Sequence, residues 1–349
     1  MLSQKLKQEL EYYEKLYFAL DEPVPYKGGL EVYPVLVKDY YKFYTALTCI
    51  TMNKNVKKEK YIDDKGNEAI REVSNPQGIS MSYLAYLISC MQQNDIGPLV
   101  TSQVITLLEM VFRIQNGIYC PDCEKQCGGD KDKLEDVRTK TFITYENLSS
   151  GLRAFDSIQD KDEKISKQRE YLKHILTCPV CRGNRREVFS IKNQGEQGRA
   201  SKLCIRDIEL NNQDFERLRA IITHYNIVDY KDDVYIDPDL KEELDIKAQM
   251  QNKDYTSPTL EKQLICVSIS TPYTIEQLKE ISMRKLSLML KTIDAKESYY
   301  AQVQAMYSGM VKFKQDPKHW IFSDNSRDIS KELTTLDDVK KKFAPVTGG

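Results

Sequence analysis

The chain of 349 residues has only three histidines and one tryptophan, and it lacks the short motifs that mark common active sites. His174, His224 and His319 lie far apart in the sequence, and none belongs to an H-E-x-x-H zinc motif. G-x-S-x-G, the Walker loop and G-x-G-x-x-G are also missing. We therefore expect that the protein is not an enzyme.

Long apolar stretches are missing as well, because no window approaches the roughly eighteen apolar residues of a membrane-spanning helix. The first residues, MLSQKLKQELEYYEKLYFAL, do not have the pattern of a signal peptide and indicate an amphipathic helix. We therefore expect no membrane partner and synthesis in a reducing cytoplasm. There the nine cysteines are expected to be thiols or metal ligands rather than disulfides.

Neither sign of charge dominates, since 51 Lys and Arg residues are balanced by 52 Asp and Glu residues. This balance gives no overall field that would attract a polyanion, so nucleic acid is not the expected partner. Arg182, Arg185 and Arg186 are a local exception, and they leave open either a phosphate contact or a surface face that meets protein.

An acidic stretch lies further along the chain and could suggest a site for a hard metal ion. Its spacing lacks the central glycine and the final glutamate of a calcium loop, and we interpret it as a solvated loop. The stretch contains Asp229, Asp232, Asp233, Asp237 and Asp239.

Helical periodicity is the main pattern that is present, and 41% hydrophobic residues allow a substantial core. Small β elements are expected in a hairpin from Tyr26 to Val37 and around the cysteines, whereas 54–67 is expected to be a charged surface loop. Gly117 is expected to end a helix in the left-handed conformation. We therefore predict a mostly α fold with small β elements. The helices are expected at 2–20, 38–50, 79–91, 98–116, 131–137, 161–176, 214–226, 259–270, 274–292 and 295–313.

The length suggests two or three folded regions, at roughly 100–200 residues for a domain. We expect an N-terminal α(+β) domain at 1–119, a cysteine-bearing region with a charged helical insertion at 120–205, a helical domain at 206–323 and a polar tail at 324–349. Three helix starts in the third region are predicted from their capping residues, namely Asn212, Ser257-Pro258 and the Thr274–Gln277 capping box.

Two pairs of cysteines carry the strongest chemical pattern. Cys120-Pro-Asp-Cys123 and Cys178-Pro-Val-Cys181 share the form C-P-x-C. Two residues between cysteines allow a tight turn to direct both sulfurs to one side, and two such turns complete a tetrahedral four-thiolate site. The intervening residues 124–177 are many for a zinc ribbon, but the cost of closing a loop grows only logarithmically with its length. We predict a structural zinc ion held by these four cysteines.

Two other residues could take part in this site. Cys127 extends the first pair to C-x2-C-x3-C, and His174 lies four residues before Cys178. A closed site of four thiolates needs neither. The four remaining cysteines, each in an apolar run, are interpreted as buried thiols; they are Cys49, Cys90, Cys204 and Cys266.

The segment from Tyr26, YKGGLEVYPVLVKDYYKFY, followed by ISMSYLAYL and an apolar helix that leads into C-x-x-C, resembles the baseplate hub and tail-assembly proteins of contractile-tailed bacteriophages. In that family a β element with Pro and Val-Lys-Asp precedes the helices, and here Lys27 to Asp39 has this pattern. The resemblance covers mainly residues 26–123, and Ala305–Phe313 with His319-Trp320 is similar in character.

The resemblance implies a structural protein of the virion tail or baseplate, in a symmetric assembly with other tail proteins. A tail-assembly chaperone that leaves the virion is the alternative within the family. A zinc-ribbon protein that binds nucleic acid is the alternative outside it.

Overall fold

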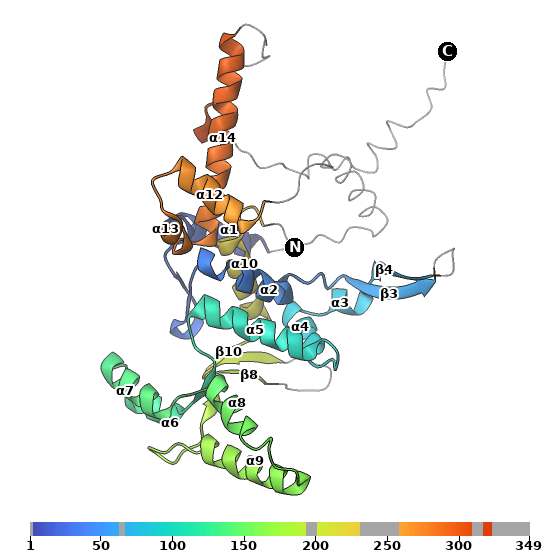
Figure 1. Cartoon of the computed structure of the whole chain (residues 1–349), viewed down its shortest axis with the longest axis vertical. Coiled ribbons are helices and arrows are strands. Elements are labelled where there is room, and N and C mark those ends of the chain that lie inside the picture. The colour runs from blue at the N-terminus through green and yellow to red at the C-terminus, as the bar shows by residue number, and fades with distance from the viewer. Residues whose placement is uncertain (1–2, 63–66, 193–200, 231–257, 309–316, 323–349) are drawn as a thin grey trace. The chain divides into compact units, whose positions relative to one another are not determined.

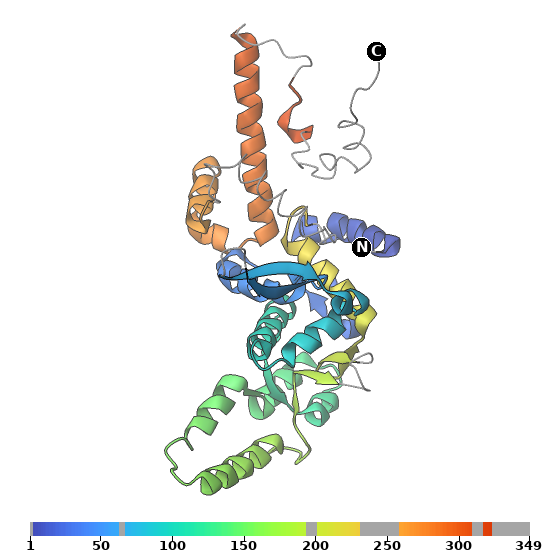
Figure 2. The same cartoon turned by 90° about the vertical axis from the view of Figure 1, so that its right-hand side faces the viewer.

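The computed structural model describes residues 3–62, 67–192, 201–230, 258–308 and 317–322. The chain divides into two compact units, which are residues 1–257 with 279–284, and residues 258–278 with 285–349. Helices predominate in the described residues, and the strands form small antiparallel sheets of two or three strands (Figures 1 and 2). The predicted mostly α fold with small β elements is confirmed.

Ten helices of the first unit are described. They are α1 (Gln4–Leu16), α2 (Tyr40–Thr51), α3 (Pro76–Ser80), α4 (Tyr83–Met91), α5 (Gly97–Phe112), α6 (Pro121–Gln126), α7 (Lys131–Thr141), α8 (Tyr145–Arg153), α9 (Lys161–Leu176) and α10 (Asn212–Asn226). The strands are β1 (Val24–Pro25), β2 (Glu31–Val32), β3 (Val56–Ile62), β4 (Glu68–Ser74), β5 (Gly117–Tyr119), β6 (Ile143–Thr144), β7 (Arg186–Glu187), β8 (Phe189–Lys192), β9 (Lys202–Ile205) and β10 (Ile208–Leu210).

The core of the first unit lies where α2, α4, α5 and α10 pack together. Apolar side chains recur at helical spacing on these helices and are almost fully buried, for example Leu84, Leu87, Leu107, Leu108, Leu218 and Ile221. The three-stranded sheet β10-β9-β8 adds Leu203, Ile205 and Leu210 to the same core. Burial of such side chains from water is the main stabilising contribution to a fold of this kind.

The cap of α10 is one residue earlier than the sequence predicts. The side chain of Asn211, not Asn212, accepts the backbone N–H of Asp214, and the Asp214 carboxylate accepts the backbone N–H of Asn211. This reciprocal capping box satisfies two N–H groups that the first turn of a helix leaves unpaired.

Two other local predictions are wrong. The sequence predicts a charged loop at 54–67, but 56–62 form β3, which pairs with β4 in an antiparallel ribbon, and 63–66 lie outside the described residues. Arg113, with φ 52°, takes the left-handed position after α5, and Gly117 lies in β5 instead. A Cβ atom at Gly117 would lie 2.3 Å from the carbonyl oxygen of Ile143 on the neighbouring strand β6, so this glycine allows close strand contact.

A hairpin is present near the predicted range of Tyr26 to Val37, but it is shorter and its first strand lies before Tyr26. Val24 pairs with Val32 and Pro25 with Glu31. Gly28 has φ 67°, which glycine adopts without strain. The Tyr26 ring is buried, and its hydroxyl donates a hydrogen bond to the carbonyl oxygen of Asp214 at the start of α10.

The C-terminal helices are α12 (Leu260–Ser270), α13 (Ile275–Lys279) and α14 (Met283–Tyr307). The side chain of Thr259 caps α12, whereas Ser257 lies outside the described residues. Thr274 and Gln277 form the predicted capping box, with each side chain bonded to the backbone N–H of the other residue. The helix that follows ends at Lys279 rather than near Thr292, and α14 is one helix where the sequence predicts two.

Backbone pairing within the first unit, to which residues 279–284 belong, explains this break. The backbone of residues 281–283 lies beside the segment around Leu36, which forms an isolated bridge with Ser282. The N–H of Val37 donates to the carbonyl of Ile281, and the N–H of Met283 donates to the carbonyl of Val35. These bonds hold 281–283 extended, so α13 cannot continue into α14. Among the described residues no helix is both long and apolar enough to cross a lipid bilayer.

Candidate metal centre

The structure brings the two C-P-x-C turns together. Cys120 follows β5, and Cys123 lies in the first turn of α6, which Pro121 begins. Cys178 and Cys181 lie in a turn shortly after α9. Each residue offers one Sγ atom, and all four sulfur atoms lie within 4.8 Å of one another.

The spacing of the sulfur atoms fits one tetrahedral metal ion. The Sγ atoms of Cys120 and Cys181 are 3.4 Å apart, and those of Cys123 and Cys178 are 3.6 Å apart. Four sulfurs at about 2.3 Å from a common centre would lie about 3.8 Å from one another. A disulfide would require about 2.05 Å, and all four residues are free cysteines. The described geometry therefore fits a four-thiolate metal site.

The second turn supplies backbone donors and a close approach to the first. The N–H of Gly183 lies 3.3 Å from the Sγ of Cys181, and the N–H of Cys178 donates to the carbonyl of Gly183 at 2.8 Å. A Cβ atom on Gly183 would lie 2.6 Å from a carboxylate oxygen of Asp122 in the first turn. Arg182, which lies between Cys181 and Gly183, has a left-handed backbone conformation with φ 56°. The N–H of Gly183, which points at the sulfur of Cys181, stabilises that sulfur in its thiolate form.

Burial and neighbouring donors act differently on the thiols of this group. Burial raises the pKa of Cys120 and of Cys123. Burial also opposes ionisation of Cys178, but backbone N–H groups of Cys181 and Val180, with the thiols of the first turn, lower its pKa to about 7. Cys120, Cys123 and Cys178 are buried and Cys181 is partly exposed. A cation at the centre would stabilise all four thiolates, which are the form that binds metal.

Cys127 and His174 lie outside this group of four. Cys127 is buried, and its Sγ donates to the carbonyl of Cys123 at 3.3 Å. His174 lies in the last turn of α9. Among the described residues, the four cysteines are the one group of His, Cys, Asp and Glu side chains found at metal-binding spacing.

The cysteine turns are anchored to the body of the first unit on two sides. Tyr119, directly before Cys120, is buried in the main core, and β5 pairs with both β6 and β7. Glu124, directly after Cys123, accepts hydrogen bonds from Arg206 at 2.8 Å and from Arg138 at 3.0 Å. Arg206 also lies over the Tyr119 ring. Sequence reasoning missed Glu124 and Arg206, because nothing in the sequence relates residues this far apart.

The charged insertion between the turns has little core of its own. Helices α7 and α9 bury no apolar side chain fully, and α8 buries Leu148. The cysteines form a separate small cluster with Val137 packed against them. A metal ion would therefore supply stabilisation that burial of apolar surface does not give here.

The three arginines of the possible phosphate contact do not share one face. Arg185 is buried, and its Nη1 donates to the carbonyl of Ile175 at 2.8 Å. Arg182 and Arg186 are exposed, and Arg186 lies 3.4 Å from a carboxylate oxygen of Asp207.

Two further predictions about single residues can be compared with the structure. Of the remaining cysteines, Cys49, Cys90 and Cys204 are buried as predicted, but Cys266 is exposed on α12. Its neighbours in the sequence are apolar, but it lies on the outer face of that helix. The acidic stretch from Asp232 to Asp239 lies outside the described residues.

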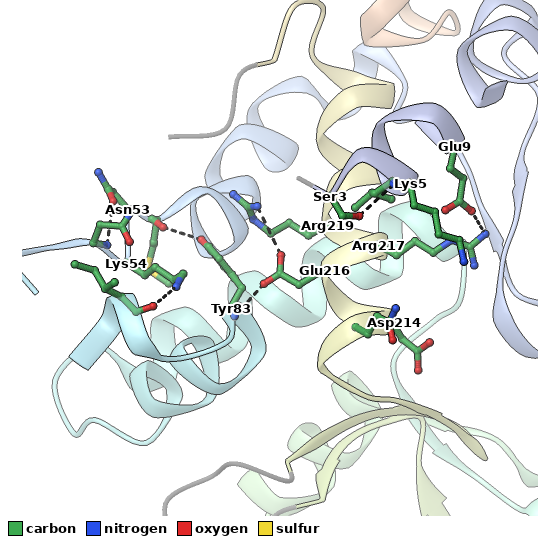
Figure 3. Close-up of a pocket in the computed structure, with 15 residues that line it drawn as sticks. Ser3, Lys5, Glu9, Asn53, Lys54, Tyr83, Asp214, Glu216, Arg217 and Arg219 are labelled. Carbon is green, nitrogen blue, oxygen red and sulfur yellow. Dashed lines mark hydrogen bonds and ion pairs between the residues drawn. The ribbon is translucent and has the colours of Figure 1, made fainter. Parts of the chain in front are cut away.

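A polar hollow of about 1130 Å³ lies near α1, α4 and α10, and Figure 3 shows its lining. Arg217 pairs with Glu9 across α10 and α1. Glu216 accepts the backbone N–H of Tyr83 at 3.0 Å, and the guanidinium of Arg219 lies 4.2 Å from the centre of the Tyr83 ring. These charged groups bond to other parts of the protein, and they hold the three helices together.

A comparison with known protein families finds a match in the C-terminal part of the chain. Residues 249–323 match the family model of the YomV second domain, which carries the name of a phage-associated protein. The matched range includes α12, α13 and α14. No curated protein and no solved structure matches the chain. The C-terminal part is therefore similar to a phage-related domain, and the cysteine turns lie outside the matched range.

Proposed function

We propose that this chain is a structural component of a bacteriophage tail, in the baseplate or hub, and that it acts through protein contacts rather than catalysis. The observation that carries the proposal is the match of residues 249–323 to a phage-related domain. The main part of the resemblance to tail-module proteins, at residues 26–123, lies outside the matched range, whereas its minor part at Ala305–Phe313 falls within it.

We also propose that the four cysteines hold a structural zinc ion. Four thiolates at tetrahedral spacing are the ligand set that zinc prefers in structural sites, and they leave no open position for a substrate. The site joins β5 and α6 to the end of α9, which have little apolar packing between them. Zinc would thus fix the insertion against the body of the first unit.

Exposed aromatic side chains support a role in protein contacts. Tyr41 and Tyr44 lie on α2 with 67% and 41% of their surface exposed, and Tyr40 packs against both rings. On α14, Tyr300 and Tyr307 are 50% and 82% exposed. Tyrosine is enriched at protein interfaces because its ring buries a large area while its hydroxyl stays hydrated. We propose these two faces as contacts with other tail proteins.

The nucleic-acid alternative receives little support from the three arginines near the second cysteine turn. Arg182 is exposed, but Arg185 donates to a carbonyl in the interior and Arg186 lies beside Asp207. A phosphate-binding face requires several cations that point outward together. We therefore retain the tail protein as the proposal.

The test is to locate the protein in phage particles. Particles that carry a tagged copy would be purified, split into heads, tails and baseplates, and analysed by quantitative mass spectrometry. We expect the protein in the tail or baseplate fraction at a fixed ratio to the other components. Presence only in assembly intermediates would instead establish the assembly-factor alternative. Tails that form normally without the protein, and do not contain it, would contradict both.

A further inference from the structure

The ribbon of β3 and β4 is a sheet with two open edges. Its strands pair residue by residue, from Val56 with Ser74 to Ile62 with Glu68. Within the described residues no further strand joins this sheet, and the two strands pack mainly against each other. Figure 1 shows the ribbon extending past α3, away from the helices of the core. Each strand therefore presents a row of backbone N–H and C=O groups to its surroundings.

The ribbon buries too little apolar surface to be stable on its own. Tyr61 and Ile62 are 39% and 73% exposed, and the side chains of Lys60 and Glu68 are 76% and 79% exposed. An isolated two-stranded hairpin is at best marginally stable in water, because no second layer covers its side chains. A further strand on either edge would add the hydrogen bonds and cross-strand contacts that the ribbon lacks.

The base of the ribbon is fixed to the body of the first unit. The N–H of Asn75 donates to the carbonyl of Asn55 at 2.8 Å, and the Nδ2 atom of Asn75 donates to the carbonyl of Lys54 at 3.1 Å. The ammonium group of Lys54 donates in turn to the carbonyls of Gly78 and Met81, at 3.0 and 2.8 Å. The strands are therefore held at their base while their edges stay open, which suits a contact with another molecule.

Charge distinguishes the two edges. The sequence of β3, VKKEKYI, has three lysines and one glutamate, whereas that of β4, EAIREVS, has two glutamates and one arginine. Within the ribbon Glu59 lies opposite Arg71, and Lys58 lies opposite Glu72. Opposite charges at facing positions stabilise a pair of strands, and like charges destabilise it. A strand that fits the outer edge of β4 should therefore have the charge pattern of β3.

A second copy of the chain supplies such a strand in a matching register. In an antiparallel pair, facing residues alternate between those that direct their backbone N–H and C=O groups toward each other and those that direct them outward. The outward groups of β3 and β4 consequently lie at facing positions. The outer edge of β4 can thus meet the outer edge of β3 in another copy with the same residues opposite each other, so that Arg71 again faces Glu59.

Pairing between two identical edges is less favourable. An antiparallel contact between two β3 strands that matches all seven residues places Glu59 opposite Glu59 and Lys58 opposite Lys60. The same contact between two β4 strands places Arg71 opposite Arg71. Like charges at facing positions repel, so a contact between unlike edges is favoured. A contact of this kind repeats from copy to copy instead of ending at a dimer.

We propose that this ribbon joins copies of the chain, with β4 of one copy pairing antiparallel with β3 of the next, so that the sheet continues from copy to copy. The contact closes into a ring or extends as a filament, according to the rotation between neighbouring copies. The proposal goes beyond the tail function, because it names the contact between copies and holds wherever the chain is located.

The first experiment measures the mass of the purified full-length protein by sedimentation velocity over a range of protein concentrations. We expect assemblies larger than a dimer, which grow with protein concentration and weaken as salt is added, because salt screens exposed charge pairs. A monomer at every concentration would contradict the proposal, and so would a dimer that does not grow.

An exchange of charges tests the register without removing the opposite charges within the ribbon. The double variant Glu59→Arg with Arg71→Glu keeps opposite charges at these positions in each copy, so it should fold and assemble with itself. Beside the original protein it places two arginines opposite each other at one contact and two glutamates at the other. We expect the variant and the original to associate at least about threefold more weakly than each does with itself, measured by energy transfer between labelled copies.

The matched control exchanges an exposed charge pair outside the ribbon, Asp136→Lys with Lys140→Asp on α7. This variant should associate with the original protein as strongly as the original does with itself. Equally strong association of the ribbon variant with the original would show that copies meet through another surface. Failure of the ribbon variant to assemble with itself, although its thermal unfolding matches that of the original, would contradict the proposed register.

Discussion

Glu124, near the start of the cysteine-bearing region, and Arg206, directly after its end, form an ion pair of 2.8 Å. Glu124 follows the ligand candidate Cys123, whereas Arg206 lies in the left-handed turn between β9 and β10. Both side chains are mostly buried, and burial lowers the pKa of Arg206. The pair connects the first cysteine turn directly to the sheet of the main core.

Removing one partner of this pair should destabilise the protein strongly. Glu124→Ala leaves Arg206 and Arg138 without their shared carboxylate, and we expect the free energy of unfolding to fall by about 3 kcal/mol. The double variant Glu124→Leu with Arg206→Met should lose less, because no unpaired charge is left buried. Chemical denaturation measures both. Asp136→Ala, which breaks the exposed pair with Lys140, is the control and should cost no more than about 0.5 kcal/mol.

The metal site gives the second prediction. Elemental analysis of purified protein should find about one zinc ion per chain. Cys120→Ser and Cys181→Ser should each lower the zinc content sharply, and should lower the free energy of unfolding by several kcal/mol, on the order of 3–5, because metal binding and folding are coupled. Cys266→Ser, at an exposed position outside the site, should leave both unchanged. Full zinc content in the Cys120 and Cys181 variants would contradict the assignment.

Ionisation of Glu209 should make the stability of the protein depend on pH. Its carboxylate lies 2.7 Å from the ammonium groups of both Lys192 and Lys202, and these hydrogen bonds lower its pKa from 4.5 to about 2. The pKa of Glu209 is lower in the folded protein than in the unfolded chain. Its contribution to the free energy of unfolding is therefore complete above pH 4.5 and is lost as the pH falls toward 2. Metal-free protein should therefore lose stability across this window.

Glu209→Gln should reduce that loss, and the difference between the two proteins should shrink as the pH falls toward 2 and vanish below it. The comparison uses metal-free protein because protonation of thiolates would otherwise release zinc at low pH. A constant difference between the variant and the original at every pH would show that the carboxylate does not titrate in this way.

The three arginines after the second cysteine turn should behave differently from one another. Arg185→Ala removes a buried donor and leaves the carbonyl of Ile175 without it, so we expect a loss of about 1–3 kcal/mol. Arg186→Ala changes an exposed side chain and should cost less than about 0.5 kcal/mol. Neither variant should change the weak binding of DNA, measured by fluorescence anisotropy at physiological salt. Parallel losses of tight DNA binding would favour the nucleic-acid alternative.

The cysteine turns and the strongly periodic helices could be predicted from the sequence. A C-P-x-C turn is a local structure, and helix α9 spans the predicted residues 161–176. The ribbon of β3 and β4 could not be recognised. Its strands, VKKEKYI and EAIREVS, mix charges with apolar residues without the regular alternation that a half-buried sheet imposes. The sequence therefore resembles a surface loop.

The other misses depend on distant contacts. The helix break before α14 is set by backbone bonds to Val35 and Val37, which no local pattern near Ser282 could indicate.

Arg113 and Arg182 adopt left-handed backbone conformations although neither is glycine. Glycine predicts such positions because it is unstrained there, so a non-glycine residue gives no local indication. The four-region division of the chain stays a prediction.

The segment 279–284 has a consequence for any attempt to separate the two units. It belongs to the first unit, while the residues on both sides of it belong to the second. The part of the chain that matches the phage-related domain therefore contains a piece of its neighbour's fold. Deleting everything after residue 257 would strip the backbone partners from Val35 and Val37 and remove Arg284, which bonds to Glu14 and to the carbonyl of His224. The two units are thus not modular, and a gene fusion or an exchange of segments would have to transfer them together.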